Sequence, residues 1–208
     1  MLRPAPYKPG VYFSSTDRPT VRHCRIHDNA ACGIHLNGDP KEGGDGVISG
    51  VRIEQNLIYN NGKKGGAAIN MDGVEHALIQ QNRLYRNAAG GITVFHLDGA
   101  RSGPDIMIRE NTIDFDPGVG RYGIQVHNGS TGVSVFRNAV TCGRGPALEV
   151  DTASIPGLTS DQNILKTTSR PEPVRLNDEN WLTLQAWQTQ SKQDTHSLSE
   201  GEGDRGAR

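Results

Sequence analysis

Several residue classes are scarce in this chain of 208 residues, and each shortage excludes a class of protein. Three cysteines, Cys24, Cys32 and Cys142, lack metal-ligand spacing, so we expect each to act as a small buried hydrophobe rather than part of a disulfide scaffold. No apolar run reaches the ~18 residues of a membrane span. The formal net charge of -1 predicts neither nucleic acid nor a membrane as a partner.

The residues that are plentiful favour strands and turns over helices. The chain contains 26 glycines and 11 prolines, and asparagine is abundant, while leucine and alanine are modest. At this length one sizeable domain can bury a real core. The composition therefore predicts an all-β protein of many short strands joined by turns.

One pattern recurs along the chain: an aliphatic residue, two spacers, asparagine, one spacer and another aliphatic residue. The asparagines are separated by steps of 26, 29, 27 and 25 residues, and Cys24 takes their place in the earliest copy. The copies are VRHCRIHDN (21–29), IEQNLIYNN (53–61), IQQNRLYRN (79–87), IRENTIDFD (108–116), VFRNAVTCG (135–143) and SDQNILKTT (160–168), with asparagine at 56, 82, 111, 138 and 163.

A second motif interleaves with the first and alternates apolar and polar residues with period two. Such alternation is typical of a strand that buries one face. Its copies are CGIHLNGD (32–39), AAINMDG (67–73), GGITVFHLDG (90–99), YGIQVHNG (122–129) and PALEVDT (146–152).

Two short strands in each repeat cannot close a core alone, so the repeats must stack. Propeller blades need ~40 residues and four strands, and leucine-rich repeats need more leucine. The remaining fold is a parallel β-helix of about five to six coils, with strands stacked at ~4.8 Å. We expect the asparagines to form turns and a ladder of side-chain amides, because asparagine tolerates left-handed backbone geometry.

The end of the chain differs in character, which divides it into three parts: a β-helix over 1–168, a loop and capping segment over 169–199, and a disordered tail over 200–208. Trp181, Leu184 and Trp187 have helical spacing, and Thr183 is a plausible N-cap. We expect this helix to cover the open end of the last coil. A sugar-stacking platform of the tryptophans is the alternative.

These repeats resemble those of right-handed parallel β-helix proteins of the pectate-lyase-like superfamily, over roughly residues 10–168. The closing LTLQAWQTQSKQDTHSLS resembles the C-terminal segment of many bacterial members, in which a tryptophan-bearing helix precedes Gly-Gln-Asp-x-His-Ser. Lys192 stands in place of that glycine, while Gln193, Asp194, His196 and Ser197 match.

The resemblance implies a bacterial protein that is secreted or periplasmic and acts on a polysaccharide. It also implies that this chain is a C-terminal portion whose N-terminal edge is covered by further coils or by a capping partner. The fold hosts polysaccharide lyases, glycoside hydrolases, esterases, epimerases and adhesins, so it predicts no single reaction.

Two columns of outward side chains follow from the period-two register of the second motif. They lie on the face where the superfamily usually binds its glycan, and neighbours should be one strand spacing apart. The first column holds His35, Asn70, Thr93, Gln125 and Glu149, and the second holds Asn37, Asp72, Phe95, His127 and Asp151. An exposed sheet face is polar in any soluble protein, but these columns are rich in histidine and carboxylate and lack lysine and arginine.

Candidate catalytic residues come from these columns. His127 lies one coil from Asp151, so the carboxylate can orient the imidazole as a general acid or base. Glu149 and Asp151 lie two residues apart, which places their carboxyls ~6–8 Å apart, near the separation in inverting glycosidases. Asp72 completes the catalytic set. The candidate substrate-binding residues are His35, Asn37, Asn70, Phe95, Gln125, His96, Arg101 and Arg121.

The sequence thus favours a polysaccharide lyase or glycoside hydrolase, and a non-catalytic glycan-binding or structural module is the alternative. A lyase predicts a basic group or Ca²⁺ beside His127, a hydrolase predicts paired carboxylates, and a binding module predicts dispersed polar and aromatic residues. We expect no metal or other cofactor, with Ca²⁺ as the one alternative. Asp39, Glu42 and Asp45 in GDPKEGGDG do not follow a calcium-loop pattern and are expected to form a solvated turn.

Overall fold

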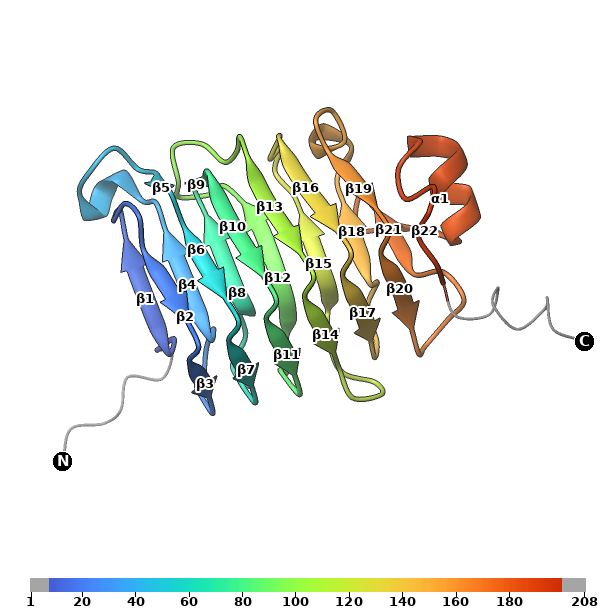
Figure 1. Ribbon diagram of the computed structural model, residues 1–208, viewed down its shortest axis with the longest axis horizontal. Coiled ribbons are helices and arrows are strands. Elements are labelled where there is room, and N and C mark those ends of the chain that lie inside the picture. The colour runs from blue at the N-terminus through green and yellow to red at the C-terminus, as the bar shows by residue number, and fades with distance from the viewer. Residues whose placement is uncertain (1–7, 200–208) are drawn as a thin grey trace, which may run out of the picture.

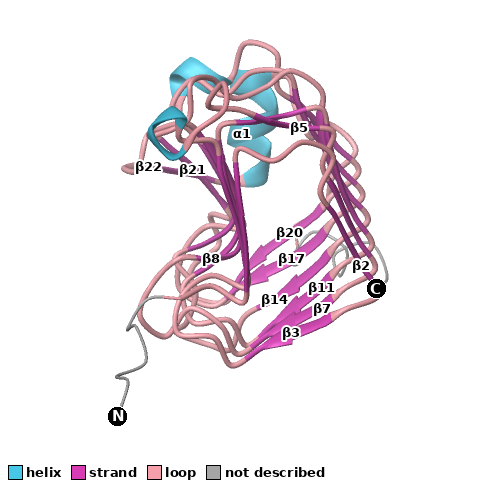
Figure 2. Ribbon diagram, turned by 90° about the vertical axis from the view of Figure 1, so that its left-hand side faces the viewer, coloured by secondary structure: helices cyan, strands magenta, loops and turns pink. Residues whose placement is uncertain are grey.

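The computed structural model describes residues 8–199, which form a parallel β-solenoid of about six turns with one short helix near the C-terminal end (Figure 1). Three sheets, A, B and C, run along the solenoid as three sides around a common core (Figure 2). The predicted all-β solenoid is therefore confirmed. No helix among the described residues is both long and apolar enough to span a membrane.

Sheet A contains the strands of the second motif and carries the two predicted columns. Its strands pair in parallel, except for the last pair, β21 and β22. The strands are β1 (Val11–Ser14), β4 (Ile34–Asn37), β8 (Ala67–Asp72), β12 (Gly90–Phe95), β15 (Tyr122–Val126), β18 (Leu148–Val150), β21 (Val174–Leu176) and β22 (Asn180–Leu182).

Sheets B and C contain the two halves of the asparagine motif. Sheet B comprises β2 (Thr20–Arg22), β6 (Arg52–Glu54), β10 (Ala77–Gln80), β13 (Ile106–Arg109), β16 (Val133–Phe136) and β19 (Thr159–Asp161). Sheet C comprises β3 (Arg25–His27), β7 (Leu57–Tyr59), β11 (Arg83–Tyr85), β14 (Thr112–Asp114), β17 (Ala139–Cys142) and β20 (Ile164–Thr167). The minor elements are β5 (Ile48–Ser49), β9 (Val74–Glu75), and the 3₁₀ turns η1 (Pro40–Glu42) and η2 (Thr152–Ser154).

The core is a set of aliphatic stacks, because equivalent inward residues of successive coils are paired in register. On sheet A one stack consists of neighbours paired in sequence, and all five of its side chains are fully buried. Its members in order are Ile34, Ile69, Ile92, Ile124 and Leu148. Burying each such side chain contributes roughly 1.5–3 kcal/mol. Each coil thus completes the core of its neighbours, which is why the repeat needs copies to fold.

A column of small residues lies where the chain enters sheet A, and it explains the small residue that opens the second motif. A Cβ added to Gly91 would lie 2.2 Å from the carbonyl oxygen of Gly123, and one added to Gly123 would lie 2.5 Å from that of Ala147. Successive coils approach too closely here for a larger side chain.

The predicted asparagine ladder runs between sheets B and C, and its members are buried. In each step the backbone N–H and the side-chain amide of one asparagine donate to the side-chain oxygen of the next. For Asn82 both distances to Asn111 Oδ1 are 3.0 Å. Asn111 Nδ2 also donates to the Ile79 carbonyl at 2.9 Å. The ladder comprises Asn56, Asn82, Asn111, Asn138 and Asn163.

The left-handed residue of each turn is the one before the ladder asparagine. This corrects the expectation that the asparagine itself takes that geometry. The asparagine is instead free to use its side chain as a donor and acceptor between coils. The left-handed residues are His23, Gln55, Gln81, Glu110, Arg137 and Gln162, with φ from 53° to 58°.

A second, shorter ladder was not predicted, and it lies where the chain leaves sheet C. Asn29 Nδ2 donates to Asn61 Oδ1 at 2.8 Å, and Asn61 Nδ2 donates to Asn87 Oδ1 at 3.1 Å. The two adjacent asparagines of the YNNG stretch therefore differ in role, since Asn60 is the left-handed residue and Asn61 is the ladder member.

The C-terminal cap has the predicted helix, α1 (Leu184–Ser191), with Thr183 as its N-cap and Trp187 fully buried. The segment predicted as a loop leaving the coil differs, because β21 adds a further rung to sheet A. Trp181 belongs to β22 and not to the helix, which corrects its predicted place. The predicted disordered tail lies outside the described residues.

The matching C-terminal motif ends the asparagine ladder. Asn163 donates its Nδ2 to Asp194 Oδ1 at 2.9 Å, and its backbone N–H to Ser197 Oγ at 2.8 Å. Trp187 Nε1 donates to the other oxygen of Asp194 at 2.9 Å. Lys192 is left-handed with φ 61°, which accounts for a glycine at this place in the resembling sequences.

The cysteine prediction is confirmed for two of the three thiols. Cys32 and Cys142 are buried and free, whereas Cys24 is free and exposed at the ladder position of the first coil. Its backbone N–H still donates to Asn56 Oδ1, at 2.9 Å, so the ladder continues to this coil through the backbone alone.

Candidate functional site

The first predicted column of sheet A is confirmed in register along its whole length. His35 pairs with Asn70, Asn70 with Thr93, Thr93 with Gln125, and Gln125 with Glu149. The structure extends the column by one residue at each end, Tyr12 and Arg175, which the sequence analysis did not include.

The C-terminal half of this column is a continuous hydrogen-bond chain. Thr93 Oγ1 donates to Gln125 Oε1 at 2.8 Å, and Gln125 Nε2 donates to Glu149 Oε2 at 3.3 Å. Arg175 donates from Nε at 3.1 Å and from a terminal nitrogen at 2.8 Å to the other oxygen, Glu149 Oε1. Both oxygens of Glu149 are thus engaged by neighbours from adjacent coils.

Glu149 is fully buried although it was predicted to point outward, because the rung of Arg175 and the turn at Asp178 cover it. Burial raises the pKa of Glu149 to about 7, and the hydrogen bond with Asp178 acts in the same direction, while Arg175 opposes both. The same hydrogen bond lowers the pKa of Asp178. Near neutral pH the carboxyl of Glu149 can therefore both give and take a proton.

His127 lies beside this carboxyl at the end of β15. Its Nε2 lies 3.7 Å from Glu149 Oε1, and its side chain is 14% exposed. This nitrogen is buried and has no hydrogen-bond partner among the described residues. Burial lowers the pKa of His127, against the opposing effect of Asp178 and Asp151, so the imidazole tends to be neutral and able to accept a proton.

The predicted pairing of His127 with Asp151 is not a direct hydrogen bond or ion pair among the described residues, although the Asp151 carboxylate does oppose the lowering of the His127 pKa by burial, as expected. The Asp151 carboxylate accepts the backbone N–H groups of Asn128 at 2.7 Å and Ser154 at 2.8 Å, so it caps the turn η2. Asp151 therefore does not form with Glu149 the pair of facing carboxyls that a glycosidase needs.

Asp72 has a turn role as well, which disfavours its predicted catalytic one. Its carboxylate is 3% exposed and accepts the backbone N–H groups of Leu97, Asp98 and Gly99, at 2.9, 3.2 and 3.1 Å. These three bonds hold the turn that follows β12. Both carboxylate oxygens of Asp72 therefore accept hydrogen bonds from the backbone of its own chain.

The N-terminal candidates form a separate group at the other end of the column. Asn37 Nδ2 donates to the hydroxyl of Tyr12 at 2.9 Å, and that hydroxyl donates to Glu42 at 2.8 Å. His35 packs edge-on against Tyr12, with ring centroids 5.3 Å apart, and burial lowers its pKa. Glu42 of the predicted solvated turn thus reaches back to the first coil.

The remaining candidates do not join the group around Glu149. Asn70 and Phe95 are half-buried in their strands. Arg101 forms a two-point ion pair with Glu75, at 3.0 and 3.2 Å, so its charge is compensated. Arg121 is exposed at the start of β15, and His96 has a buried Nδ1 with no hydrogen-bond partner among the described residues.

Two residues of the site were missed, namely Arg175 and Asp178, and Trp181 was expected only in the alternative of a sugar-stacking platform. Trp181 is flanked by two guanidiniums, with the Arg170 and Arg175 carbons 3.7 and 5.1 Å from its ring centroid. A signal was present, since Val-Arg-Leu at 174–176 alternates with period two and Arg175 follows Glu149 by 26 residues, one repeat step.

Ligand atoms of His127, Glu149 and Asp178 lie within 4.8 Å of one another, so we tested their fit to the predicted alternative, Ca²⁺. Ca²⁺ takes six to eight oxygen ligands, whereas this group offers one nitrogen and two carboxylates. The guanidinium of Arg175 on Glu149 also opposes a divalent cation. The group does not fit Ca²⁺.

Comparison with known proteins gives one match. A family model described as right handed beta helix region matches residues 7–166. Neither the curated proteins nor the solved structures include a significant match to the chain.

Proposed function

The chain belongs to the right-handed β-helix family, and from that premise we propose that it cleaves an extracellular, uronate-containing polysaccharide by acid–base chemistry at His127. The fold is one of carbohydrate-active or structural β-helix proteins in general. The observation that carries the proposal is the contact of a neutral, half-buried imidazole with a buried carboxyl whose pKa is about 7. Such pairs cluster at functional sites.

The geometry supports a lyase over a hydrolase. A glycosidase places two carboxyls on either side of the scissile bond, roughly 5–9.5 Å apart. Here Glu149 and Asp178 hydrogen-bond each other and Glu149 is fully buried, so they cannot flank a sugar. A lyase needs a base and a positive charge near it, and Arg175 supplies that charge beside His127.

In the proposed reaction His127 takes the proton from the sugar carbon next to the uronate carboxylate. The bond to the glycosidic oxygen then breaks, a double bond forms in the sugar ring, and the departing oxygen takes a proton from water. Because Nε2 of His127 faces Glu149, Nδ1 is the nitrogen left for the substrate. Glu149 acts through His127 as a positioning and proton-holding residue, and Arg175 orients Glu149.

The test is a screen of the purified chain against acidic and neutral polysaccharides, with two readouts in parallel. Ultraviolet absorbance detects the unsaturated ends that only a lyase makes, and a reducing-end assay detects every cleavage. Absorbing products from an acidic polysaccharide are the expected result. Reducing ends without absorbance would indicate a hydrolase and contradict the elimination.

The second candidate is a non-catalytic glycan-binding module, which the flanked indole of Trp181 favours. Binding of a glycan without new chain ends from any polysaccharide in the screen would support this alternative. That result would also contradict the catalytic role proposed for His127.

A further inference from the structure

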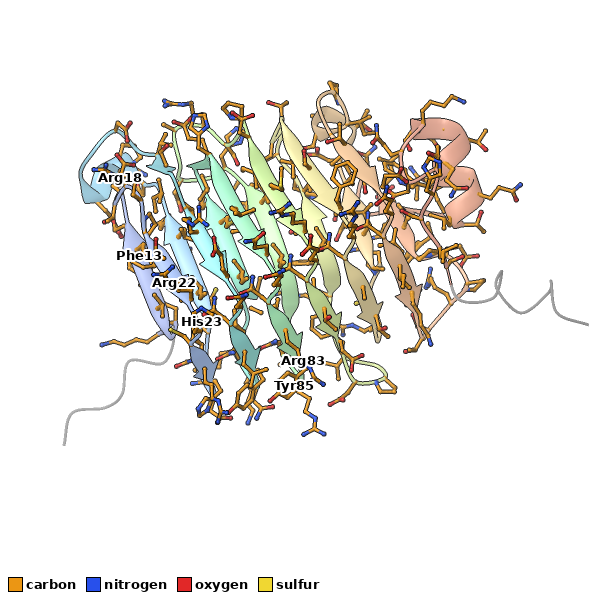
Figure 3. All side chains as sticks on the ribbon, viewed as in Figure 1. Phe13, Arg18, Arg22, His23, Arg83 and Tyr85 are labelled. Atoms are coloured by element: carbon orange, nitrogen blue, oxygen red, sulfur yellow. The ribbon has the colours of Figure 1, made fainter. Side chains whose placement is uncertain are left out.

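A shallow depression lies outside sheet A, at the corner between sheets B and C near the N-terminal end. Its volume is about 390 Å³, and His23, Arg25 and Arg83 are among the residues that line it. Figure 3 labels Arg22 and His23 toward the N-terminal end of the molecule and Arg83 with Tyr85 further along sheet C. We call His23, Arg25 and Arg83 the cationic corner.

The cationic corner has no compensating acid. Among residues 8–199 no carboxylate lies within ion-pair distance of Arg25 or Arg83, and both side chains are exposed. The nearby acids have other partners: Glu54 pairs with Arg52 at 2.6 Å, Asp28 pairs with His27 at 2.7 Å, and Glu110 accepts a hydrogen bond from Gln81 at 2.9 Å. Arg25 and Arg83 therefore present positive charge at the depression without an ion-pair partner.

Arg83 is also supported from below. The Arg83 guanidinium lies 5.5 Å from the centroid of the Tyr85 ring. Tyr85 stacks on Tyr59 at 4.9 Å, and Tyr59 stacks on His27 at 4.7 Å, so three rings in register form a rigid base. A guanidinium held in this way loses less side-chain entropy when it binds a ligand.

The spacing of the arginines indicates the ligand. Arg25 and Arg83 both pair with Leu57 from opposite sides, so they are two strand spacings apart, about 9.6 Å. That length is close to one disaccharide of an extended glycan, and Leu57 offers an apolar contact for the sugar between them. Carboxylate and phosphate groups are the bidentate partners of guanidinium, and the sulfate of an acidic glycan presents oxygens in a similar arrangement.

From this charge, support and spacing we propose that the cationic corner is a second binding surface, which holds an acidic polysaccharide through anionic groups one disaccharide apart. It is formed by sheet C and the turns that join sheet B to sheet C, whereas the residues of the proposed reaction lie on or next to sheet A. The surface therefore does not depend on catalysis at His127.

The test compares two double variants of equal charge change. Arg25→Gln with Arg83→Gln removes the charge of the corner, and Arg137→Gln with Arg144→Gln removes two exposed arginines elsewhere. Binding is measured by affinity electrophoresis and titration calorimetry with polygalacturonate, dextran sulfate, uncharged dextran and duplex DNA. Circular dichroism and thermal unfolding establish that each variant is folded.

We expect the corner variant to bind polygalacturonate and dextran sulfate about tenfold more weakly than the parent, and the control variant to change less than about twofold. Neither variant should bind uncharged dextran. An equal loss in both variants would overturn the proposal, because it would indicate general charge attraction. Tighter corner-dependent binding of DNA than of either acidic glycan would overturn the ligand assignment.

The outcome is separable from that of the proposed reaction. If the parent chain cleaves no polysaccharide but the corner variant still loses acidic-glycan binding, the inference stands and the proposed function fails. If cleavage is observed but the corner variant binds acidic glycans as tightly as the parent does, the proposed function stands and the inference about the cationic corner fails.

Discussion

Nε2 of His127 lies 3.7 Å from Oε1 of Glu149, so a half-buried imidazole and a buried carboxyl meet across adjacent coils of sheet A. The pKa of each group is shifted from its ordinary value. Burial lowers the pKa of the histidine and raises that of the glutamate to about 7. Burial disfavours the charged form of both groups, so it shifts their two pKa values in opposite directions. Proton transfer between them therefore costs little free energy.

The first prediction concerns His127. His127→Ala should lower the rate of glycan cleavage at least about 100-fold, the usual contribution of a general base, while thermal unfolding stays cooperative. His76→Ala is the matched control, since His76 is an exposed histidine paired with Asp105 on the other side of the solenoid. Turnover that survives in His127→Ala would exclude the role proposed for this residue.

The second prediction concerns the pH dependence of stability. Because the folded pKa of Glu149 is raised from 4.5 to about 7, the native state binds more protons than the unfolded state between these values. The contribution of this group is therefore fully present below about pH 4.5 and is lost as the pH rises through about 7. The loss amounts to about 3 kcal/mol.

Glu149→Gln removes this titration. The unfolding free energy of the variant minus that of the parent should therefore increase as the pH rises from about 5 to about 8. Urea unfolding at several pH values measures the difference. Asp178 has a lowered pKa, and its own contribution is lost only as the pH falls below its unfolded value of 3.8, outside this window. If the unfolding free energies of the parent and of Glu149→Gln change with pH in the same way, the pKa of Glu149 is not raised.

The repeat made much of the fold predictable. A column such as His35 to Glu149 follows from aligning copies, because strand period and coil stacking leave little freedom in register. The ladder asparagines were predictable for the same reason. The left-handed residue before them was not, since Gln55, Glu110 and Arg137 share only a long polar side chain, which is not typical of left-handed geometry.

The site was less predictable because it depends on contacts that no repeat encodes. Glu149 was placed correctly on sheet A but is buried only because Arg175 and Asp178 follow in the next coil. Asp151 has the right position in its column, yet its carboxylate turns to the backbone of the next turn. Position in a column is set by register, whereas side-chain direction at a strand end is set by the local turn.

The third prediction tests the ladder. Asn111→Ala should lower the unfolding free energy by about 2–4 kcal/mol, because it removes four hydrogen bonds and leaves buried partners such as the Ile79 carbonyl unsatisfied. Asn180→Ala, at an exposed position of β22, is the control and should stay within about 0.5 kcal/mol of the parent. Equal effects in chemical denaturation would show that the ladder adds no stability.

The fourth prediction concerns Lys192, the left-handed residue that ends α1 with φ 61°. Lys192→Gly should raise the unfolding free energy by about 0.5–1 kcal/mol, since glycine adopts this geometry without the Cβ penalty. The Lys192 Nζ bond to the Thr189 carbonyl, 2.8 Å and exposed, offsets little of that gain. Lys192→Ala loses the same bond but keeps a Cβ, so it should be no more stable than the parent. If alanine and glycine stabilise the chain equally in thermal unfolding, the left-handed geometry is not the cause.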